Sequence, residues 1–210
     1  MSEYLHNNHQ EDNTITLNGR GQTTPIPDIA IIRLGVQTQG EDLNKVQSEN
    51  ANLSQAVIDA LRQIGITDIR TFQYTISKLY EYVNGNQIDK GYTVRNILEI
   101  KINDIGQTGQ VIDTAVANGA NVVDLVSFDV SNRDLYYQEA LNRAITNAIE
   151  KAESISQHLG IPVNLIPIRI EETSAAPAPI LRNVAERAFA TPIEPGELLI
   201  EAFVTAVFQY

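Results

Sequence analysis

Histidine is the side chain best suited to acid–base and metal chemistry near neutral pH, and this chain contains three. His6 and His9 lie in a polar N-terminal stretch, and His158 lies near the end of a long segment with helical apolar spacing. A cation in the last turn of a helix is stabilised by the helix dipole and requires no catalytic role. The histidines therefore predict neither a catalytic site nor a metal site.

Carboxylates at regular spacing are the next candidates, because hard metal ions prefer oxygen ligands. Asp124, Asp129 and Asp134 follow one another at intervals of five residues. Along a strand this interval places Asp124 and Asp129 on opposite faces, and the start of a helix explains Asp134 better. Cysteine is absent, which excludes disulfides, thiolate nucleophiles and cysteine-based zinc sites. We predict no metal-binding residues.

The Gly19-Arg20-Gly21 triplet is a glycine pattern that could suggest a phosphate-binding loop. It follows a predicted strand, but Pro25 and Pro27 come next, where a phosphate site needs a helix N-terminus. A bend or bulge in the strand is the better interpretation. The chain contains no G-x-S-x-G, H-E-x-x-H, P-loop or EF-hand pattern. We therefore predict no catalytic residues, no cofactor and no enzymatic activity.

Two segments are suited to contacts with other proteins. Four tyrosines cluster around a predicted hairpin: Tyr74, Tyr80, Tyr82 and Tyr92. Tyrosine is favoured at interfaces because it has an apolar body and a polar tip, although ordinary strand composition explains the cluster equally well. The second segment is a Pro/Ala-rich arm at about residues 171–196. A stretch of that length without clear structure is more often a functional arm than part of a compact domain.

The elements that would carry these residues follow from the apolar spacing. The pattern predicts strands at 14–17, 29–36, 72–76, 92–102, 122–130, 161–170 and 198–208, and helices at about 38–64, 104–119 and 133–159. A short helix at 182–189 would lie within the arm. The order ββ-α-ββ-α-β-α-β-(Pro/Ala-rich arm)-β predicts an α+β fold with a largely antiparallel sheet and three main helices. We expect residues 1–13 to form a disordered leader and 14–210 one domain.

Local signals fix the ends and faces of these helices. Thr38 and Glu41 form a capping-box pattern for the first helix, and Gly65 ends it because glycine accepts the left-handed conformation at low cost. The long helix repeats alanine every four residues, at Ala140, Ala144, Ala148 and Ala152. Small side chains in such a row let another element approach the helix closely.

Charge and hydropathy exclude several classes of partner. The 210-residue chain has a formal net charge of −11, from 15 basic and 26 acidic residues. A field of that sign repels nucleic-acid phosphates and anionic membrane surfaces. No apolar run approaches the ~18 residues of a membrane-spanning helix, and the N-terminus is not a secretory signal. Unless a signal segment was omitted, the chain as written is expected in the cytoplasm.

Four segments together resemble the SIMPL domain family, a domain of unknown function. They are ITLNGRGQTTPIPDIAIIRLGV at 15–36, GYTVRNILEIKINDIGQTGQVIDTAVANGANVVDLVSFDVSN at 91–132, ALNRAITNAIEKAESISQHLG at 140–160 and TPIEPGELLIEAFVTAVF at 191–208. The resemblance implies an α+β fold and no established enzymatic activity, and no catalytic residues can be transferred. Bacterial members include periplasmic immunogenic and oxidative-stress-associated proteins, and some relatives assemble into large ring- or channel-like homo-oligomers.

Three functional hypotheses remain open. The first is a non-enzymatic homo-oligomer with a stress-related or scaffold role. The second is an adaptor that binds another protein. The third is a small-molecule binding protein or an enzyme whose site is assembled from dispersed residues, which sequence patterns do not reveal.

Overall fold

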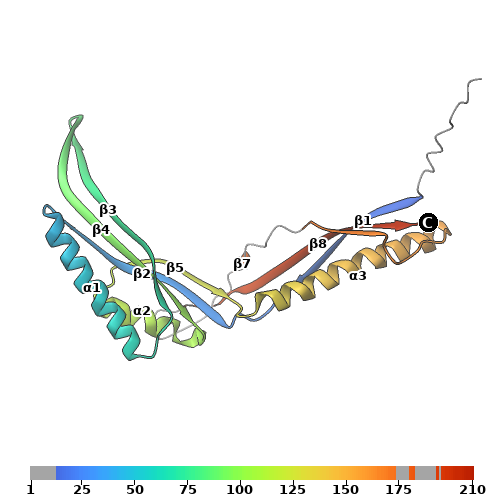
Figure 1. Cartoon of the computed structure of the whole chain (residues 1–210), viewed down its shortest axis with the longest axis horizontal. Helices are drawn as coiled ribbons and strands as arrows, with labels where there is room; N and C mark the ends of the chain where they lie inside the picture. Colours follow the sequence, from blue (N-terminus) through green and yellow to red (C-terminus); the bar gives the residue numbers. More distant parts are fainter. Residues whose placement is uncertain (1–12, 174–179, 183–192, 194) are drawn as a thin grey trace, which may run out of the picture. The chain divides into compact units, whose positions relative to one another are not determined.

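The computed structural model describes residues 13–173, 180–182, 193 and 195–210 (Figure 1). Within these residues the protein has three α-helices and two four-stranded antiparallel sheets, so the predicted α+β class is confirmed. The chain divides into two compact units. One consists of residues 26–131 with the described part of 181–198, and the other of the described parts of 1–25, 132–180 and 199–210.

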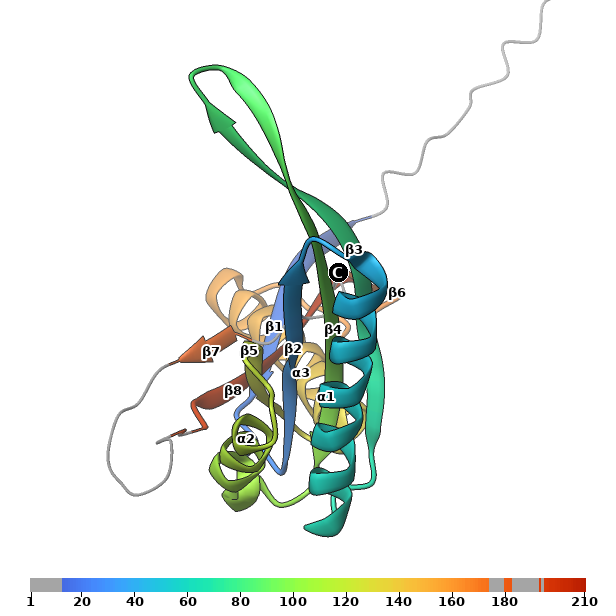
Figure 2. The same cartoon turned by 90° about the vertical axis from the view of Figure 1, so that its left-hand side faces the viewer.

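The unit of residues 26–131 is a sheet with two helices on one face, as Figure 2 shows. The strand order is β3-β4-β2-β5, with bounds β2 (Ile29–Gly40), β3 (Ile69–Val83), β4 (Asn86–Ile102) and β5 (Val122–Asp129). The helices are α1 (Leu43–Gln63) and α2 (Thr108–Ala117), the latter preceded by the short 3₁₀ helix η1 (Ile105–Gln107). All three strand pairings are antiparallel.

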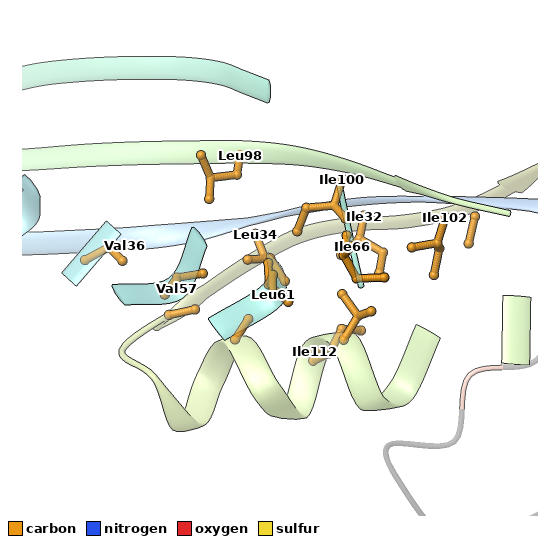
Figure 3. Close-up of a cluster of buried hydrophobic side chains, with 14 of the residues drawn as sticks. Ile32, Leu34, Val36, Val57, Leu61, Ile66, Leu98, Ile100, Ile102 and Ile112 are labelled. Carbon is orange, nitrogen blue, oxygen red and sulfur yellow. The ribbon is translucent and has the colours of Figure 1, made fainter. Parts of the chain in front are cut away.

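The core of this unit lies between the sheet and the two helices. Alternate residues of a strand point to opposite faces, so one face of β2 and β4 supplies the apolar side chains. Figure 3 shows them against α1 and α2: Ile32, Leu34, Val36, Leu98, Ile100 and Ile102 from the strands, Val57 and Leu61 from α1, Ile66 from the loop after α1, and Ile112 from α2. Residues of the other parity on β2 and β4 point to the opposite face of the sheet.

A buried amide fixes α1 on this sheet. The side chain of Asn50 is fully buried, and its Nδ2 donates to the backbone carbonyls of Val36 and Val94 at 2.9 and 3.1 Å. Ser54 Oγ contacts Asn50 Oδ1 at 3.4 Å, one helical turn away. The amide thereby satisfies polar atoms of two neighbouring strands inside an apolar core, as buried polar groups require.

The first helix begins differently from the prediction. Its N-cap is Asp42, whose carboxylate accepts from the backbone N–H groups of Asn44 and Lys45, so the Thr38/Glu41 capping box was wrong. Thr38 lies inside β2, where its hydroxyl donates to the Val46 carbonyl at 2.9 Å. The strand continues four residues beyond the predicted end because the polar residues after Val36 pair with β4. Gly65 follows the helix with φ +88°, as predicted.

The other unit pairs a sheet with the long helix. Strand β8 (Glu197–Gln209) pairs with β1 (Thr14–Thr23), and also with the short strands β6 (Arg169–Glu172) and β7 (Ile180–Arg182). Helix α3 (Arg133–Leu159) has the predicted bounds and ends at Gly160, which has the left-handed φ of +67°. The four alanines of its ladder are completely buried.

The Gly19-Arg20-Gly21 triplet is neither a bend nor a bulge. It pairs with β8 in unbroken register, so that interpretation was wrong. A Cβ on Gly19 would lie 2.0 Å from the carbonyl oxygen of Ala144, and one on Gly21 would lie 2.0 Å from that of Ala140. The two glycines therefore let the backbone of α3 rest directly on β1. This is the close approach that the alanine ladder predicted.

The predicted strand at 161–170 was also wrong. Strand pairing begins only at Arg169, and the preceding residues form an irregular segment. This segment contacts β8 through isolated backbone hydrogen bonds, from the Asn164 N–H to the Gln209 carbonyl and from the Ile168 N–H to the Val207 carbonyl. Within the arm at 171–196, the structure shows the end of β6 and the strand β7, and β8 begins directly after the arm at Glu197. The predicted leader (apart from Asn13) and most of the short helix at 182–189 lie outside the described residues.

Candidate functional site

The most exposed apolar surface of the unit of residues 26–131 is the hairpin formed by β3 and β4. Asn84 and Gly85 have φ values of +52° and +81° and form the two-residue turn of the predicted hairpin. Pairing of β4 with β2 ends at Tyr92, opposite Gly40, so the tip of the hairpin continues beyond the rest of the sheet (Figure 2). We call residues 72–92 the tyrosine hairpin.

Large apolar side chains of the tyrosine hairpin are open to solvent. The exposed ones are Phe72, Tyr74, Ile76, Tyr80, Tyr82, Val83 and Ile88. Tyr82 is the extreme, at 70% exposure, and of the four predicted tyrosines only Tyr92 is half-buried. Register shifts on either side of Phe72 and between Lys78 and Tyr80 add twist to the hairpin. Because exposed apolar patches are a feature of surfaces that contact other molecules, the tyrosine hairpin is a candidate site.

The charges on the tyrosine hairpin neutralise one another. Lys78 Nζ lies 3.3 Å from Asp89 Oδ2, and Lys90 Nζ lies 2.7 Å from Glu81 Oε2. Hydrogen bonds from the Gly91 N–H and from Lys78 lower the pKa of Asp89, and the carboxylate in turn raises the pKa of Lys78. With two lysines against two carboxylates, the segment has no formal net charge.

A cluster of charged side chains lies on the sheet face opposite α1 and α2. Arg33 Nε donates to Glu99 Oε2 at 2.8 Å, and Arg70 Nε donates to Glu99 Oε1 at 2.9 Å. The Arg33 guanidinium also lies over the ring of Phe72, 3.7 Å from its centroid. Hydrogen bonds from Arg70 and Arg33 lower the pKa of Glu99 below its usual value, so the buried carboxylate is ionised near neutral pH. The cluster links β2, β4 and β3.

The residues considered for metal binding are occupied in other ways. Asp124 forms an ion pair with Arg95, and Asp129 accepts from the backbone N–H of Val130. Asp134 lies in the first turn of α3 and His158 in its last, as predicted. Over the part of the chain that the structure describes, no three His, Asp or Glu side chains are grouped so that they could hold a metal ion. His6 and His9 lie outside that part.

A second exposed apolar surface lies in the other unit, and the sequence pattern misassigned it. Residues 159–168, here called the apolar segment, contain no charged side chain. Leu159, Leu165, Ile166 and Ile168 are all exposed there, Ile166 at 75%. Most of this run was predicted as part of a strand at 161–170 because its apolar content matches one. The signal against a strand was Pro162 and Pro167, which lack the N–H that pairing requires.

A comparison with known protein families assigns the chain to one of them. The sequence profile of the family described as "SIMPL: Protein of unknown function (DUF541)" matches residues 15–208. The chain belongs to the SIMPL family. This confirms the resemblance seen in the four sequence segments.

Relatives of this SIMPL protein occur in several bacteria. It is 27% identical to the "26 kDa periplasmic immunogenic protein" of Brucella melitensis over 212 residues, covering 93% of this chain and 84% of the relative. It is 26% identical to "Uncharacterized protein YggE" of Escherichia coli K12 over 195 residues, covering 90% and 78%. The YggE protein of Edwardsiella ictaluri is 24% identical, covering 81% and 73%. None of the described helices is long and apolar enough to cross a membrane.

Proposed function

We propose that this SIMPL protein is a non-enzymatic, self-associating protein with a scaffold role, and that its copies meet through the tyrosine hairpin. The observation that supports this proposal is the solvent exposure of Tyr80, Tyr82 and their apolar neighbours on a hairpin that extends beyond its sheet. Burial of a tyrosine ring stabilises an interface, and its hydroxyl can still form a hydrogen bond with a polar partner. Strand β3, which forms one side of the hairpin, is also an edge strand, so its outer backbone groups are available for pairing.

Charge favours a second copy of the chain as the partner. Two molecules that each have a net charge of −11 repel one another, so they approach best through a surface without net charge. The tyrosine hairpin is such a surface, because Lys78 and Lys90 are paired with Asp89 and Glu81. The apolar segment carries no charge at all and offers a second surface for association.

The test is the native mass of the 23.2 kDa chain by light scattering at two protein concentrations. A discrete multimer is expected for the wild-type protein, and Tyr80→Thr/Tyr82→Thr should lower its mass because threonine keeps the strand propensity and removes both rings. Tyr210→Thr is the matched control, since Tyr210 is as exposed as Tyr80 but lies outside the hairpin. A double variant with the same mass as wild type would contradict the role of the hairpin.

Ionic strength separates self-association from the adaptor hypothesis. Salt screens the repulsion between copies of the same acidic chain, so self-association should strengthen between 50 and about 300 mM salt. Binding to a basic partner protein should weaken over the same range. A protein that is monomeric at every salt concentration, and that captures one stoichiometric partner through the hairpin, would favour the adaptor instead.

The remaining parts of the proposal come from the resemblance and from sequence motifs. A non-enzymatic role is supported by the lack of any catalytic motif in the sequence, and a stress-related role is implied by oxidative-stress-associated family members. A bacterial strain without the protein, complemented by wild type or by Tyr80→Thr/Tyr82→Thr and exposed to peroxide, tests the second point. Equal survival of both complemented strains would separate any stress role from assembly.

A further inference from the structure

A small pocket opens on the sheet face opposite α1 and α2, beside the Arg33–Glu99–Arg70 cluster. Its volume is about 300 Å³, and it is lined by Ile31, Asp68, Arg70, Glu99 and Lys101. Ile31 and Lys101 are directly opposite one another on β2 and β4, and Arg70 is opposite Glu99 on β3 and β4. The backbone N–H of Lys101 donates to the Asp68 carbonyl at 3.0 Å, which holds the loop before β3 against the pocket.

The cations at this pocket are incompletely neutralised. Glu99 has both carboxylate oxygens occupied, and Arg33 already balances its charge. Arg70 directs Nε and one Nη toward the same carboxylate, so three of its five N–H groups remain for another acceptor. Lys101 makes no ion pair with any of the described carboxylates. Its nearby neighbour Asp28 uses both carboxylate oxygens to accept from Ser131 at 2.6 Å.

The balance of charge indicates the kind of anion that would fit. The lining by itself is neutral, with Arg70 and Lys101 against Glu99 and Asp68. Arg33 lies outside the lining and pairs with Glu99, so that among these five groups one positive charge is in excess, in a chain whose net charge is −11. A monoanion matches that charge. A dianionic phosphate would be repelled by Asp68 and Glu99, which lie on the pocket wall.

We infer that this pocket binds a small aliphatic carboxylic acid, with the carboxylate between Arg70 and Lys101 and the hydrocarbon chain against Ile31. Guanidinium and ammonium groups form charge-assisted hydrogen bonds to a carboxylate. Ile31 is half-buried and supplies an apolar wall next to the cations. The volume is at the lower end of the roughly 300–1,000 Å³ range of small-molecule pockets, which limits the ligand to a short chain. This inference goes beyond the proposed assembly and does not depend on it.

Saturation-transfer NMR with hexanoate as the probe tests the inference on the full chain, at constant ionic strength. Binding in the millimolar range is expected because Arg70 is largely exposed. Hexanamide has nearly the same shape but no charge and should bind at least threefold more weakly. Acetate, without the chain that contacts Ile31, and inorganic phosphate should both bind more weakly than hexanoate.

Variants locate the site. Lys101→Gln should weaken hexanoate binding about threefold, the size that one exposed ion pair supports. Lys45→Gln, which makes the same charge change on exposed α1, should leave binding unchanged. Equal binding of hexanoate and hexanamide, no saturation up to about 50 mM, or unchanged affinity in Lys101→Gln would overturn the inference. Tyr80→Thr/Tyr82→Thr keeps every pocket residue and should bind hexanoate as the wild type does. Hexanoate binding can therefore be tested independently of the assembly proposal.

Discussion

Replacing Gly21 by alanine tests the contact on which the unit containing α3 depends. The added Cβ would lie 2.0 Å from the carbonyl oxygen of Ala140 and 2.4 Å from the backbone nitrogen of Ala144. Both are backbone atoms of α3, so no side-chain rotation relieves the overlap. The helix must withdraw from β1 by about 1 Å or more before the contact becomes tolerable.

The expected loss of stability can be estimated from the contacts that weaken when α3 moves away from β1. Four alanine side chains of α3 are completely buried, and each buried carbon of this kind contributes about 0.8 kcal/mol. A gap of 0.5–1 Å forfeits a quarter to a half of the dispersion energy, or roughly 1–1.5 kcal/mol for the four methyl groups. Overpacking strain adds about 1–3 kcal/mol. Alanine also lowers the conformational entropy of the unfolded chain, which stabilises the folded state by about 0.4–1 kcal/mol. The expected net loss in the free energy of unfolding is about 3 kcal/mol.

Urea unfolding followed by far-UV circular dichroism measures this loss, which suits a chain without tryptophan. For a chain of this size, about 3 kcal/mol also corresponds to a fall in Tm of roughly 6–12 °C. Gly106→Ala is the control, because its new Cβ would meet only the flexible Asp104 side chain at 3.2 Å, and it should change stability by less than about 0.5 kcal/mol. A loss below about 1 kcal/mol in Gly21→Ala, with an unchanged m value, would refute the direct seating of α3 on β1.

Two further substitutions test the unit of residues 26–131. Asn50→Ala leaves the buried carbonyls of Val36 and Val94 without their donor and should cost about 3 kcal/mol in urea unfolding, whereas Asn44→Ala, exposed on the same helix, should cost little. Glu99→Gln should cost about 1 kcal/mol at pH 6, because solvent screens the exposed partner Arg70. The folded-state pKa of Glu99 lies below the 4.5 of the unfolded chain, so its contribution is present above pH 4.5 and is lost as the pH falls through the lower value. The stability difference between wild type and Glu99→Gln should therefore shrink between pH 6 and pH 3, and a constant difference would contradict the ion-pair explanation.

Features with a local cause were predictable from the sequence. The bounds of α3 match because a strong apolar period starts after Asn132 and a glycine ends it, and both signals act within a few residues. The turn at Asn84 and Gly85 follows from the need for positive φ at both central positions of a two-residue hairpin. The stop at Gly65 has the same local origin.

The features that were missed depend on contacts between distant residues. Gly19 and Gly21 looked like a local irregularity, yet their reason is the backbone of α3, more than one hundred residues away. Two small-residue patterns were visible: glycines two apart on one strand face, and alanines four apart on one helix face. The alanines alone predicted a close approach to the helix, and combined with the glycines they would have identified the strand that makes it. The pocket residues Asp68, Arg70 and Lys101 show no motif because they are brought together by strand register and by the hydrogen bond from the Lys101 N–H to the Asp68 carbonyl.

The two surfaces proposed for assembly are both exposed, apolar and without net charge. The pocket proposed for ligand binding is a different surface. The chain has a net charge of −11 and many carboxylates, yet the apolar segment carries none and the tyrosine hairpin carries only balanced pairs. Surfaces that are both apolar and uncharged allow like-charged copies to approach one another. Leaving such an apolar surface in contact with water is unfavourable, which favours its burial against another molecule. The pocket has the opposite character, with two cations and two carboxylates around a single aliphatic wall. The two properties should therefore be separable: tyrosine substitutions should change the native mass and keep hexanoate binding, whereas Lys101→Gln should weaken hexanoate binding and keep the mass. A substitution at either place that altered both would mean that ligand binding and association share one surface.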